Sequence, residues 1–394
     1  MKQNLKIQTK TKIPFFNLSG LNVAIVHDYL NVYGGAEGVV EAIYEIFPQA
    51  DIYTAVFNKK EMQKADVSFL NANIYYPKWK NNLTGKVGSV IHKLLIANLP
   101  LYFLTLNLKK YDLIISSTAH FAKGVRKNKN AKHFSYIHTV PKFLYGYPTS
   151  ERKRDLLFFK ILLYPLDFYL KIMDKWFSKF PDYLICNSNE VKNRIKKHWN
   201  LNAKVIYPFP NVKLKNKEEG VKGVKPNDFY LMIGRSVRYK NFKLVANILG
   251  KQNINIVIAG TGPQSKDLET LDKKYGSVKY LGFISESKKA WLLKNCKSFI
   301  LATDQEDSGM TVFEPMLYGK PVIAYYSGGF KETVINKQNG IFFKSLSSTS
   351  ILNALNIFEK TNFNQEFIKN NVKKYSKNRF KKEFLEYVST NYLK

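Results

Sequence analysis

The segment Leu301–Ile323, LATDQEDSGMTVFEPMLYGKPVI, predicts a strand, a turn and a helix in direct succession. It starts at the end of a short apolar run, which is typical of a buried strand. It continues into Met310–Tyr318, whose apolar residues have helical spacing before Gly319 and a nearby proline end the helix. The acidic turn between them carries Ser308 as the predicted N-cap. Because a helix N-terminus offers free backbone N–H groups and a positive dipole end, we expect this turn to bind a pyrophosphate through Ser308, Gly309, Met310 and Thr311.

Two carboxylates, Glu306 and Glu314, stand on either side of this turn in the pattern E-x7-E. A carboxylate close to a bound phosphate costs Coulomb energy, so these groups are better suited to accept hydrogen bonds from neutral hydroxyls. A sugar nucleotide offers such hydroxyls on its ribose and on its transferred sugar. The alternative interpretation is a solvated acidic loop at Glu306 and an exposed helix face at Glu314.

The segment resembles the donor-binding signature of the retaining GT-B glycosyltransferases of family 4. Within that family it is similar to the mannosyltransferase-type enzymes of bacterial surface polysaccharide synthesis. The likeness extends over Leu21–Val334, with one departure, since the family usually has Phe where Ser308 stands. It implies an α/β fold of the GT-B type, with two Rossmann-like domains facing across a cleft. It also implies that Glu306 orients sugar hydroxyls and that Glu314 holds the ribose.

The length and composition predict a two-domain globular protein. The 394 residues can hold two cores of ordinary size, and 45% hydrophobic with 23% charged residues is a globular composition. Apolar runs that alternate with helical stretches favour βαβ units and parallel sheets. We expect a basic disordered tail over 1–20, an acceptor-binding domain over 21–210, a linker over 211–228 and a nucleotide-sugar-binding domain over 229–375. The resemblance implies that a helix over 376–394 packs back on the first domain.

A second glycine-containing turn follows the first apolar run, Leu21–Val26. Gly34 and Gly35 stand between this predicted strand and a helix-like stretch, and glycine permits a close approach of the backbone to a ligand. Such a loop either binds an anion or serves as a plain turn. The family resemblance places it at the domain interface, facing the donor phosphates.

His138 stands where the predicted strand Phe134–Pro141, FSYIHTVP, finishes. A histidine in that place is often a structural residue. The family has a histidine beside the transferred sugar in an H-T-P-like motif, and His138 matches it with only Val140 inserted. The resemblance therefore makes His138 and Glu306 the expected catalytic residues.

Arg235 and Lys240 follow the apolar run Phe229–Ile233, the predicted first strand of the second domain. A guanidinium fork and a compact ammonium charge both suit a pyrophosphate, whereas the alternative is a solvated basic loop. We expect two further donor contacts in this domain. One is Gly262 in a tight loop, and the other is the backbone near Phe283, where the family holds the nucleotide base.

No D-x-D motif occurs in the chain, so a metal-clamped pyrophosphate is not predicted. We expect no metal and no cofactor other than the NDP-sugar itself, which is a substrate. The charge of the leaving group is then stabilised by Arg235, Lys240, the helix end at Gly309–Thr311 and the Gly34–Gly35 loop. The family implies front-face attack, in which a phosphate oxygen of the donor takes the proton of the acceptor.

The formal charge of +32 indicates an anionic membrane surface, nucleic acid or phosphorylated substrates as partners, unless it reflects a lysine-rich composition alone. Nucleic acid is not expected, because no RNP, helix-turn-helix or zinc spacing occurs. The stretch Leu156–Phe180 is rich in aromatic and aliphatic residues interrupted by lysines. It fits a helix at an anionic membrane surface and, equally, a core helix.

The chain has two isolated cysteines, and its basic start lacks the apolar core of a signal peptide, so we expect a cytoplasmic protein. Binding to an anionic membrane would place it peripherally on the inner face of the cytoplasmic membrane. The expected function is retaining transfer of a hexose, mannose by resemblance, from an NDP-sugar to a glycan or lipid-linked acceptor in surface polysaccharide or glycolipid synthesis. The alternatives are a GT-B sugar-nucleotide epimerase or hydrolase, and a non-catalytic membrane- or nucleic-acid-binding basic protein.

Overall fold

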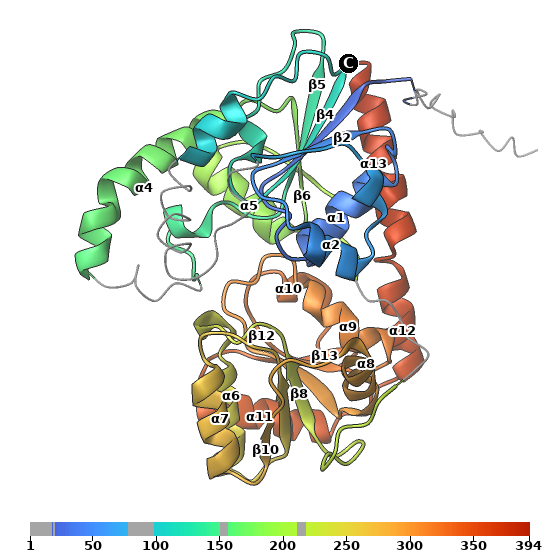
Figure 1. Ribbon diagram of the computed structural model, residues 1–394. Coiled ribbons are helices and arrows are strands. Elements are labelled where there is room, and N and C mark those ends of the chain that lie inside the picture. Colours follow the sequence, from blue (N-terminus) through green and yellow to red (C-terminus); the bar gives the residue numbers. More distant parts are fainter. Residues whose placement is uncertain (1–17, 19, 78–97, 150–156, 211–217) are drawn as a thin grey trace, which may run out of the picture.

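The computed structural model describes residues 18, 20–77, 98–149, 157–210 and 218–394 of the chain. These residues form two α/β domains, each built on one parallel sheet, with the first domain above the second in Figure 1. Almost all of the predicted tail 1–20, the first part of the predicted linker 211–228, and Leu156 lie outside the described residues. The prediction of two Rossmann-like domains is confirmed.

The first sheet has seven parallel strands in the order β3-β2-β1-β4-β5-β6-β7. The strands are β1 (Val23–His27), β2 (Asp51–Thr54), β3 (Ile74–Tyr75), β4 (Leu113–Thr118), β5 (Lys132–Ile137), β6 (Tyr183–Cys186) and β7 (Lys204–Val205). The helices of this domain include α1 (Gly35–Tyr44), α2 (Lys59–Ala65), α4 (Leu157–Phe177) and α5 (Asn189–Trp199). Residues 98–104 are also helical, and 3-10 turns lie at Ser68–Asn71, Ala122–Gly124 and Lys142–Leu144.

The second sheet has six parallel strands in the order β10-β9-β8-β11-β12-β13. The strands are β8 (Tyr230–Ile233), β9 (Ile256–Ala259), β10 (Val278–Tyr280), β11 (Ser298–Leu301), β12 (Val322–Tyr325) and β13 (Gly340–Phe343). The helices are α6 (Phe242–Lys251), α7 (Ser265–Lys274), α8 (Glu286–Asn295), α9 (Phe313–Leu317), α10 (Phe330–Thr333), α11 (Ser348–Glu359) and α12 (Gln365–Lys373), with 3-10 turns at Arg238–Lys240 and Met310–Val312.

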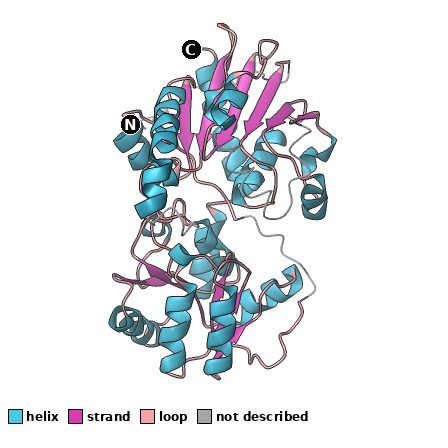
Figure 2. Cartoon of the chain, turned by 60° about the vertical axis from the view of Figure 1, so that its left-hand side comes forward, coloured by secondary structure: helices cyan, strands magenta, loops and turns pink. Residues whose placement is uncertain are grey.

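Both sheets are buried on their two faces, which is why their strands read as continuous apolar runs. In β1, Val23 and Ile25 join the cluster under α1, whereas Ala24 and Val26 join the cluster on the opposite face, under α4. Figure 2 shows strands with helices on either side in each domain. None of the helices in the described ranges is long and apolar enough to cross a membrane.

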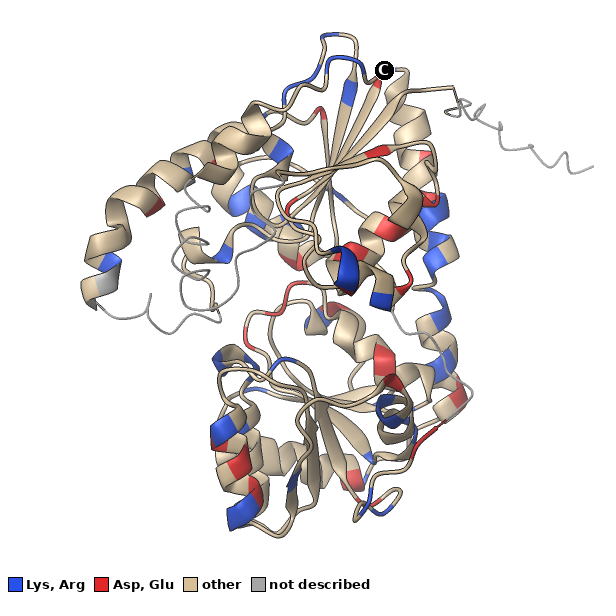
Figure 3. Ribbon diagram, viewed as in Figure 1, with Lys and Arg blue, Asp and Glu red and all other residues tan. Residues whose placement is uncertain are grey.

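The C-terminal helices connect the two domains. Ile368 and Val372 of α12 belong to a core of the second domain, whereas Phe380 and Phe384 of α13 (Lys377–Tyr392) belong to a core of the first domain. Figure 1 shows α13 in red along one side of the first domain. Figure 3 shows basic residues along this helix, and two of them, Lys377 and Lys381, pair with the Glu45 carboxylate of the first domain.

The buried carboxylate of Asp28 fixes the loop that leaves β4. Its two oxygens accept hydrogen bonds from the Thr118 hydroxyl and from the backbone N–H groups of four consecutive residues, Ala119, His120, Phe121 and Ala122, at 2.7–3.1 Å. Burial by itself would raise the pKa of Asp28, but His120, His27 and the N–H groups outweigh it and lower the pKa below 3.8. The loop is therefore held by an ionised carboxylate.

We predict that Asp28→Ala lowers the free energy of unfolding by at least ~3 kcal/mol at neutral pH, because it leaves several buried donors without an acceptor. A carboxylate with a lowered pKa stabilises the fold above its unfolded pKa, and this contribution disappears as the pH falls through the folded pKa. The difference between variant and wild type should therefore shrink in acid, below a pH of about 4. Urea unfolding at neutral and acidic pH, with Asp272→Ala on α7 as the control, measures this. Equal stability at neutral pH would contradict it.

Candidate active site

The site lies where loops at the carboxyl ends of the two sheets meet. A Cβ placed on Gly35, after β1, would come within 2.2 Å of the Met310 side chain, which follows β11. The Thr139 hydroxyl, after β5, donates a hydrogen bond to the Asp307 carboxylate at 2.9 Å. In parallel α/β sheets this edge is the one that binds ligands. The structure thus brings Gly34, Gly35 and Met310 to one place.

The acidic turn differs locally from the sequence prediction. Met310–Val312 is a 3-10 turn, and α9 that follows has only five residues. Gly309, with a φ of +68°, takes the N-cap position, and no side chain caps this helix. Ser308 is buried instead, so its prediction as the N-cap is wrong. Gly309, in the left-handed conformation, occupies the cap position, whereas the Ser308 backbone packs against Gly329, where a Cβ would lie 2.7 Å from the Ser308 carbonyl carbon.

A second glycine turn, Ser327–Gly329, supports the acidic turn from beneath. The Gly329 N–H donates to the Glu306 carbonyl at 2.9 Å, and the Gln305 N–H donates to the Ser327 hydroxyl at 3.0 Å. A Cβ on Gly328, whose φ is +54°, would lie 2.0 Å from the Glu306 carbonyl oxygen. Only glycine fits there, and the close contact fixes the backbone of Glu306.

The Glu306 side chain is half-buried and lies within electrostatic reach of Lys240. Burial raises the pKa of Glu306, the neighbouring Asp307 raises it further, and Lys240 opposes both. Burial also lowers the pKa of Lys240, against the effect of Glu306 and Glu314. Burial therefore favours the neutral forms of both Glu306 and Lys240. A ligand with a negative charge near Lys240 and hydroxyl groups near Glu306 would stabilise both side chains.

Arg235 lies at the same edge and is exposed, and its charge contributes to lowering the pKa of Lys240. The Lys240 ammonium group lies close over the backbone of Gly234, since a Cβ there would come within 2.9 Å of the Lys240 Nζ. Glu314 is half-buried and forms an ion pair of 3.0 Å with Lys289 of α8. The structure therefore brings together the predicted basic pair and both carboxylates of E-x7-E.

The Gly262 loop is packed against the residues between Gly234 and Lys240. A Cβ on Gly262 would lie 2.6 Å from the Ser236 carbonyl oxygen, so this loop also requires glycine. The Ser236 hydroxyl beside it is buried and has no hydrogen-bond partner among the described residues. Phe283 is different, because its side chain is 86% exposed. The role of the nearby backbone in holding a base stays a prediction.

His138 directly follows β5 and is held on three sides. Its Nε2 shares a hydrogen bond with the Ser117 hydroxyl at 2.7 Å, its N–H donates to the Thr118 carbonyl, and its carbonyl accepts from the Asn187 side chain. Burial lowers the pKa of His138 to about 3, with a further contribution from His27. The imidazole is therefore neutral at physiological pH.

His27 was not among the predicted site residues. It is buried at the end of β1, its Nδ1 bonds the Ser117 carbonyl at 2.7 Å, and its ring meets the His138 ring edge-on at 6.3 Å. Burial opposes its protonation, yet Glu37 of α1 and Asp28 raise the pKa of His27. Its position directly after the first apolar run, in VHDY, is the signal that could have identified it, because strand ends carry ligand contacts.

Comparison with known proteins identifies the family. The family described as Glycosyltransferase Family 4 matches residues 33–213, and Glycosyl transferases group 1 matches residues 215–377. The chain belongs to the GT-B glycosyltransferases of family 4. The alpha-1,3/1,6-mannosyltransferase ALG2 of Dictyostelium discoideum is 26% identical to it over 392 residues, which cover 86% of this chain and 89% of that protein.

The solved structures that share the fold of this family-4 glycosyltransferase include the two that follow, and they confirm the predicted GT-B arrangement. The lipopolysaccharide outer core galactosyltransferase WaaB, in its apo form, has a TM-score of 0.62 at 15% identity and covers 94% of this chain and 99% of its own. Anabaena Alr3699/HepE in complex with UDP-glucose has a TM-score of 0.62 at 17% identity, with 93% and 99% covered. The chain is a hexosyltransferase by its family.

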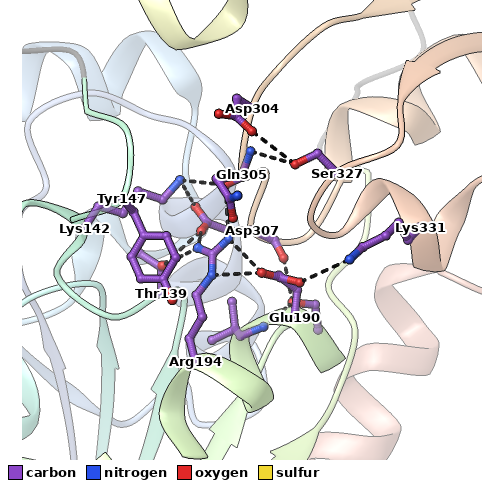
Figure 4. A network of polar contacts seen from close by, with 12 residues as sticks. Thr139, Lys142, Tyr147, Glu190, Arg194, Asp304, Gln305, Asp307, Ser327 and Lys331 are labelled. Carbon is purple, nitrogen blue, oxygen red and sulfur yellow. Dashed lines mark hydrogen bonds and ion pairs between the residues drawn. The ribbon is translucent and has the colours of Figure 1, made fainter. Parts of the chain in front are cut away.

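In this family-4 glycosyltransferase, the Asp307 carboxylate next to Glu306 ties the two domains together (Figure 4). It accepts from the Arg194 guanidinium of α5 and pairs with the Lys142 ammonium at 2.9 Å. The Arg194 and Lys142 side chains also donate to the Gln305 carbonyl, each at 3.2 Å. Arg194 is 2% exposed, so the guanidinium in this network is shielded from water, whereas Lys142 and Asp307 are partly exposed.

A second interdomain contact caps the helix that carries Arg194. The Glu332 carboxylate of α10 accepts from the backbone N–H groups of Asn189 and Glu190, at the N-terminus of α5, at 2.8 and 2.7 Å. A carboxylate of one domain thus satisfies the free N–H groups of a helix in the other, where the helix dipole also favours it. Closure of the domains and the position of the Glu306 turn are therefore coupled through α5.

We predict that Arg194→Ala weakens the contact between the domains by about 2–5 kcal/mol, because it leaves Asp307 without its main partner. Small-angle X-ray scattering should then give a larger radius of gyration, while the content of secondary structure is retained. Arg126→Ala, an exposed arginine of the first domain, serves as the control. A radius equal to that of the wild type would show that the network does not hold the domains.

Proposed function

We propose that this glycosyltransferase transfers mannose from an NDP-mannose donor, with retention of configuration, to a glycan or lipid-linked acceptor. The observation that carries the proposal is the position of Arg235 and Lys240 opposite Glu306 and Glu314, at the edge where the Gly34–Gly35 loop meets the second domain. The sequence similarity to the ALG2 mannosyltransferase supports mannose, and the related fold with bound UDP-glucose supports a nucleotide-sugar donor.

The donor would lie with its diphosphate on Arg235 and Lys240. These cations neutralise the two phosphates, and the backbone of Gly34–Gly35 and of Gly309–Thr311 offers further N–H groups from both domains. The Glu306 carboxyl is next to this position and would bind hydroxyls of the sugar. Glu314, now paired with Lys289, would bind the ribose. Basic side chains would thus bind the charged diphosphate of the donor, and carboxylates would bind its hydroxyl groups.

The reaction forms a bond between the acceptor oxygen and the anomeric carbon and breaks the bond from that carbon to the phosphate oxygen. The proton of the acceptor hydroxyl passes to a phosphate oxygen, and the nucleoside diphosphate leaves. Because acceptor and leaving group use the same face, the configuration is retained. Arg235 and Lys240 stabilise the charge that develops on the diphosphate, which is the main electrostatic demand of the step.

The neutral form of His138 fits a site next to the transferred sugar. A cation there would compete with Arg235 and Lys240 for the departing diphosphate, whereas a neutral imidazole only exchanges hydrogen bonds. The low pKa of His138, about 3, keeps it neutral throughout the physiological range. We also propose that no metal ion takes part, because the two basic side chains provide the positive charge that a metal would otherwise provide.

We predict that Glu306→Ala lowers kcat/KM for transfer by at least ~100-fold, because the carboxyl is lost at the reacting sugar. Glu306→Gln should retain part of the activity if hydrogen bonding is the main role. The melting temperature should be nearly unchanged, since the pKa of Glu306 shows that burial already opposes its charge. Glu269→Ala on the exposed side of α7 is the control. Turnover within a factor of about three of the wild type would exclude Glu306 from the site.

We predict that one of GDP, UDP, ADP and TDP raises the melting temperature clearly, and does so equally with magnesium and with a chelator. Arg235→Ala should weaken this nucleotide about 10- to 100-fold, as expected for loss of a charge-assisted hydrogen bond. The control variant Arg126→Ala should bind the nucleotide as tightly as the wild type. Binding that requires a divalent ion would contradict the metal-independent mechanism, and unchanged affinity of Arg235→Ala would remove this residue from the donor site.

Product analysis distinguishes transfer from other reactions of sugar nucleotides. The transferase should consume the donor at a useful rate only when an acceptor is present, and NMR of the product should show the donor's anomeric configuration. Rapid consumption without an acceptor would instead indicate an epimerase or hydrolase.

A further inference from the structure

Helix α4 is anchored to the first domain by one face. Its Asp174 forms an ion pair of 2.6 Å with Lys123, and neither side chain is more than 1% exposed. The other oxygen of Asp174 accepts hydrogen bonds from the Tyr145 hydroxyl and the Trp199 indole at 2.6 and 2.8 Å. Phe177 packs against Gly124, where a Cβ would lie 2.0 Å from its ring. These contacts fix the rotation of the helix about its axis.

A different face of α4 is apolar and points away from the domain. The six residues on it are between 43% and 70% exposed, and they are Phe158, Ile161, Leu162, Phe168, Ile172 and Trp176. At 3.6 residues per turn, they fall within about 120° of the helix circumference. Figure 1 shows that α4 extends away from the sheet of the first domain. The stripe is unusual for a surface helix, whose outer side is normally polar.

Basic residues follow one edge of this stripe. Lys160, Lys171 and Lys175 are exposed on α4, and Lys179 is exposed just after it. The single acidic residue on the exposed half of the helix is Asp167, because Asp174 is buried. Apolar side chains next to lysines are the combination that binds a membrane surface, with the apolar groups below the headgroups and the ammonium groups beside the phosphates.

We propose that the outward stripe of α4 is a docking surface for an anionic lipid bilayer. The charge of the stripe's edge and the net charge of +32 are complementary to anionic headgroups, and they would repel a second copy of the same chain. The aromatic content, with two Phe and one Trp among the six residues, is typical of side chains at a membrane interface. The helix would lie in the plane of the interface.

A cavity beside α4 gives this orientation a consequence for the acceptor. Its volume is about 770 Å³, and its walls come from both domains, with Tyr147, Lys160 and Tyr164 on one side and Arg238, Tyr239 and Asp304 on the other. Tyr239 connects this cavity to the Glu306 turn, because it lines the cavity and its carbonyl accepts a hydrogen bond from the Asp304 N–H at 2.9 Å. Docking through α4 would place the cavity at the membrane surface. As part of the proposed function, it would admit the acceptor from there.

The test is sedimentation of the full chain with vesicles made of phosphatidylglycerol and phosphatidylcholine in equal parts, and with pure phosphatidylcholine vesicles. The apolar variant carries Ile161→Gln, Leu162→Gln and Ile172→Gln. Its control carries Ile357→Gln, Phe367→Gln and Leu393→Gln, which replace exposed apolar residues outside α4. We expect the apolar variant to bind anionic vesicles at least ~10-fold more weakly than the wild type, and the control to bind normally.

A charge variant carries Lys160→Gln, Lys171→Gln and Lys175→Gln, and its control carries Lys251→Gln, Lys266→Gln and Lys273→Gln in the second domain. Each set removes three lysines, so both proteins have a formal charge of +29 rather than +32. We expect only the α4 set to weaken binding by at least ~10-fold. Equal loss in both sets would show that net charge and not α4 binds the vesicles, and would overturn the proposal.

Three further results would also overturn it. These are full binding by the apolar variant, equal binding to neutral vesicles, and an oligomer of the wild type that the apolar variant abolishes. The melting-temperature shift with nucleotide should be the same in all four variants. A shift without vesicle binding would leave the transferase function in place and remove the docking surface. Vesicle binding without any melting-temperature shift would support the docking surface and contradict the proposed nucleotide-sugar site.

Discussion

The bond between Arg194 and Asp307 is the interaction on which the arrangement of this glycosyltransferase depends. Arg194 comes from α5 of the first domain and is buried, and Asp307 is the neighbour of Glu306 in the turn after β11. A guanidinium that leaves water needs a carboxylate partner, because an unpaired buried charge costs several kcal/mol. The pair is therefore formed only when the domains are closed, and closure sets the position of the Glu306 turn.

The contact between the two domains also affects the charges of the side chains in the cleft. Glu306 and Lys240 are both displaced toward their neutral forms by burial, and each partly offsets the other. The bound diphosphate and sugar would satisfy both groups, since phosphates stabilise the lysine cation and hydroxyls need only a hydrogen-bond acceptor. The unfavourable burial of Glu306 and Lys240 thus favours binding of the donor that the proposed reaction requires. This electrostatic effect is largest where water is excluded from the site.

Glycine and buried ion pairs control which surfaces remain free. Gly262, Gly309 and Gly328 allow loops to approach one another more closely than any side chain would permit, which places the second-domain turns around one site. On the first domain, the buried pair of Lys123 and Asp174 orients α4. Asp174 lies on the same face of α4 as the buried Leu170 and Phe177, so anchoring this face leaves the apolar stripe on the outside. An amphipathic helix with the opposite orientation would have hidden this stripe in the core.

The sequence by itself determined the parallel sheets, the two-domain GT-B fold and most of the candidate donor site. Buried parallel strands are short apolar runs whose ends carry site residues, and together with the family resemblance this placed Arg235, Lys240, Glu306 and Glu314 at one edge. His27 was missed because its strand end gave no motif beyond a single histidine. Only the tertiary structure decided that Ser308 is buried and that Gly309 begins the helix, since this depends on the close packing of the Ser327–Gly329 turn. Likewise, only the tertiary structure decided which face of α4 is exposed and that Arg194 and Glu332 act across the cleft. These contacts join residues more than one hundred positions apart, and a local pattern carries no information about such pairs.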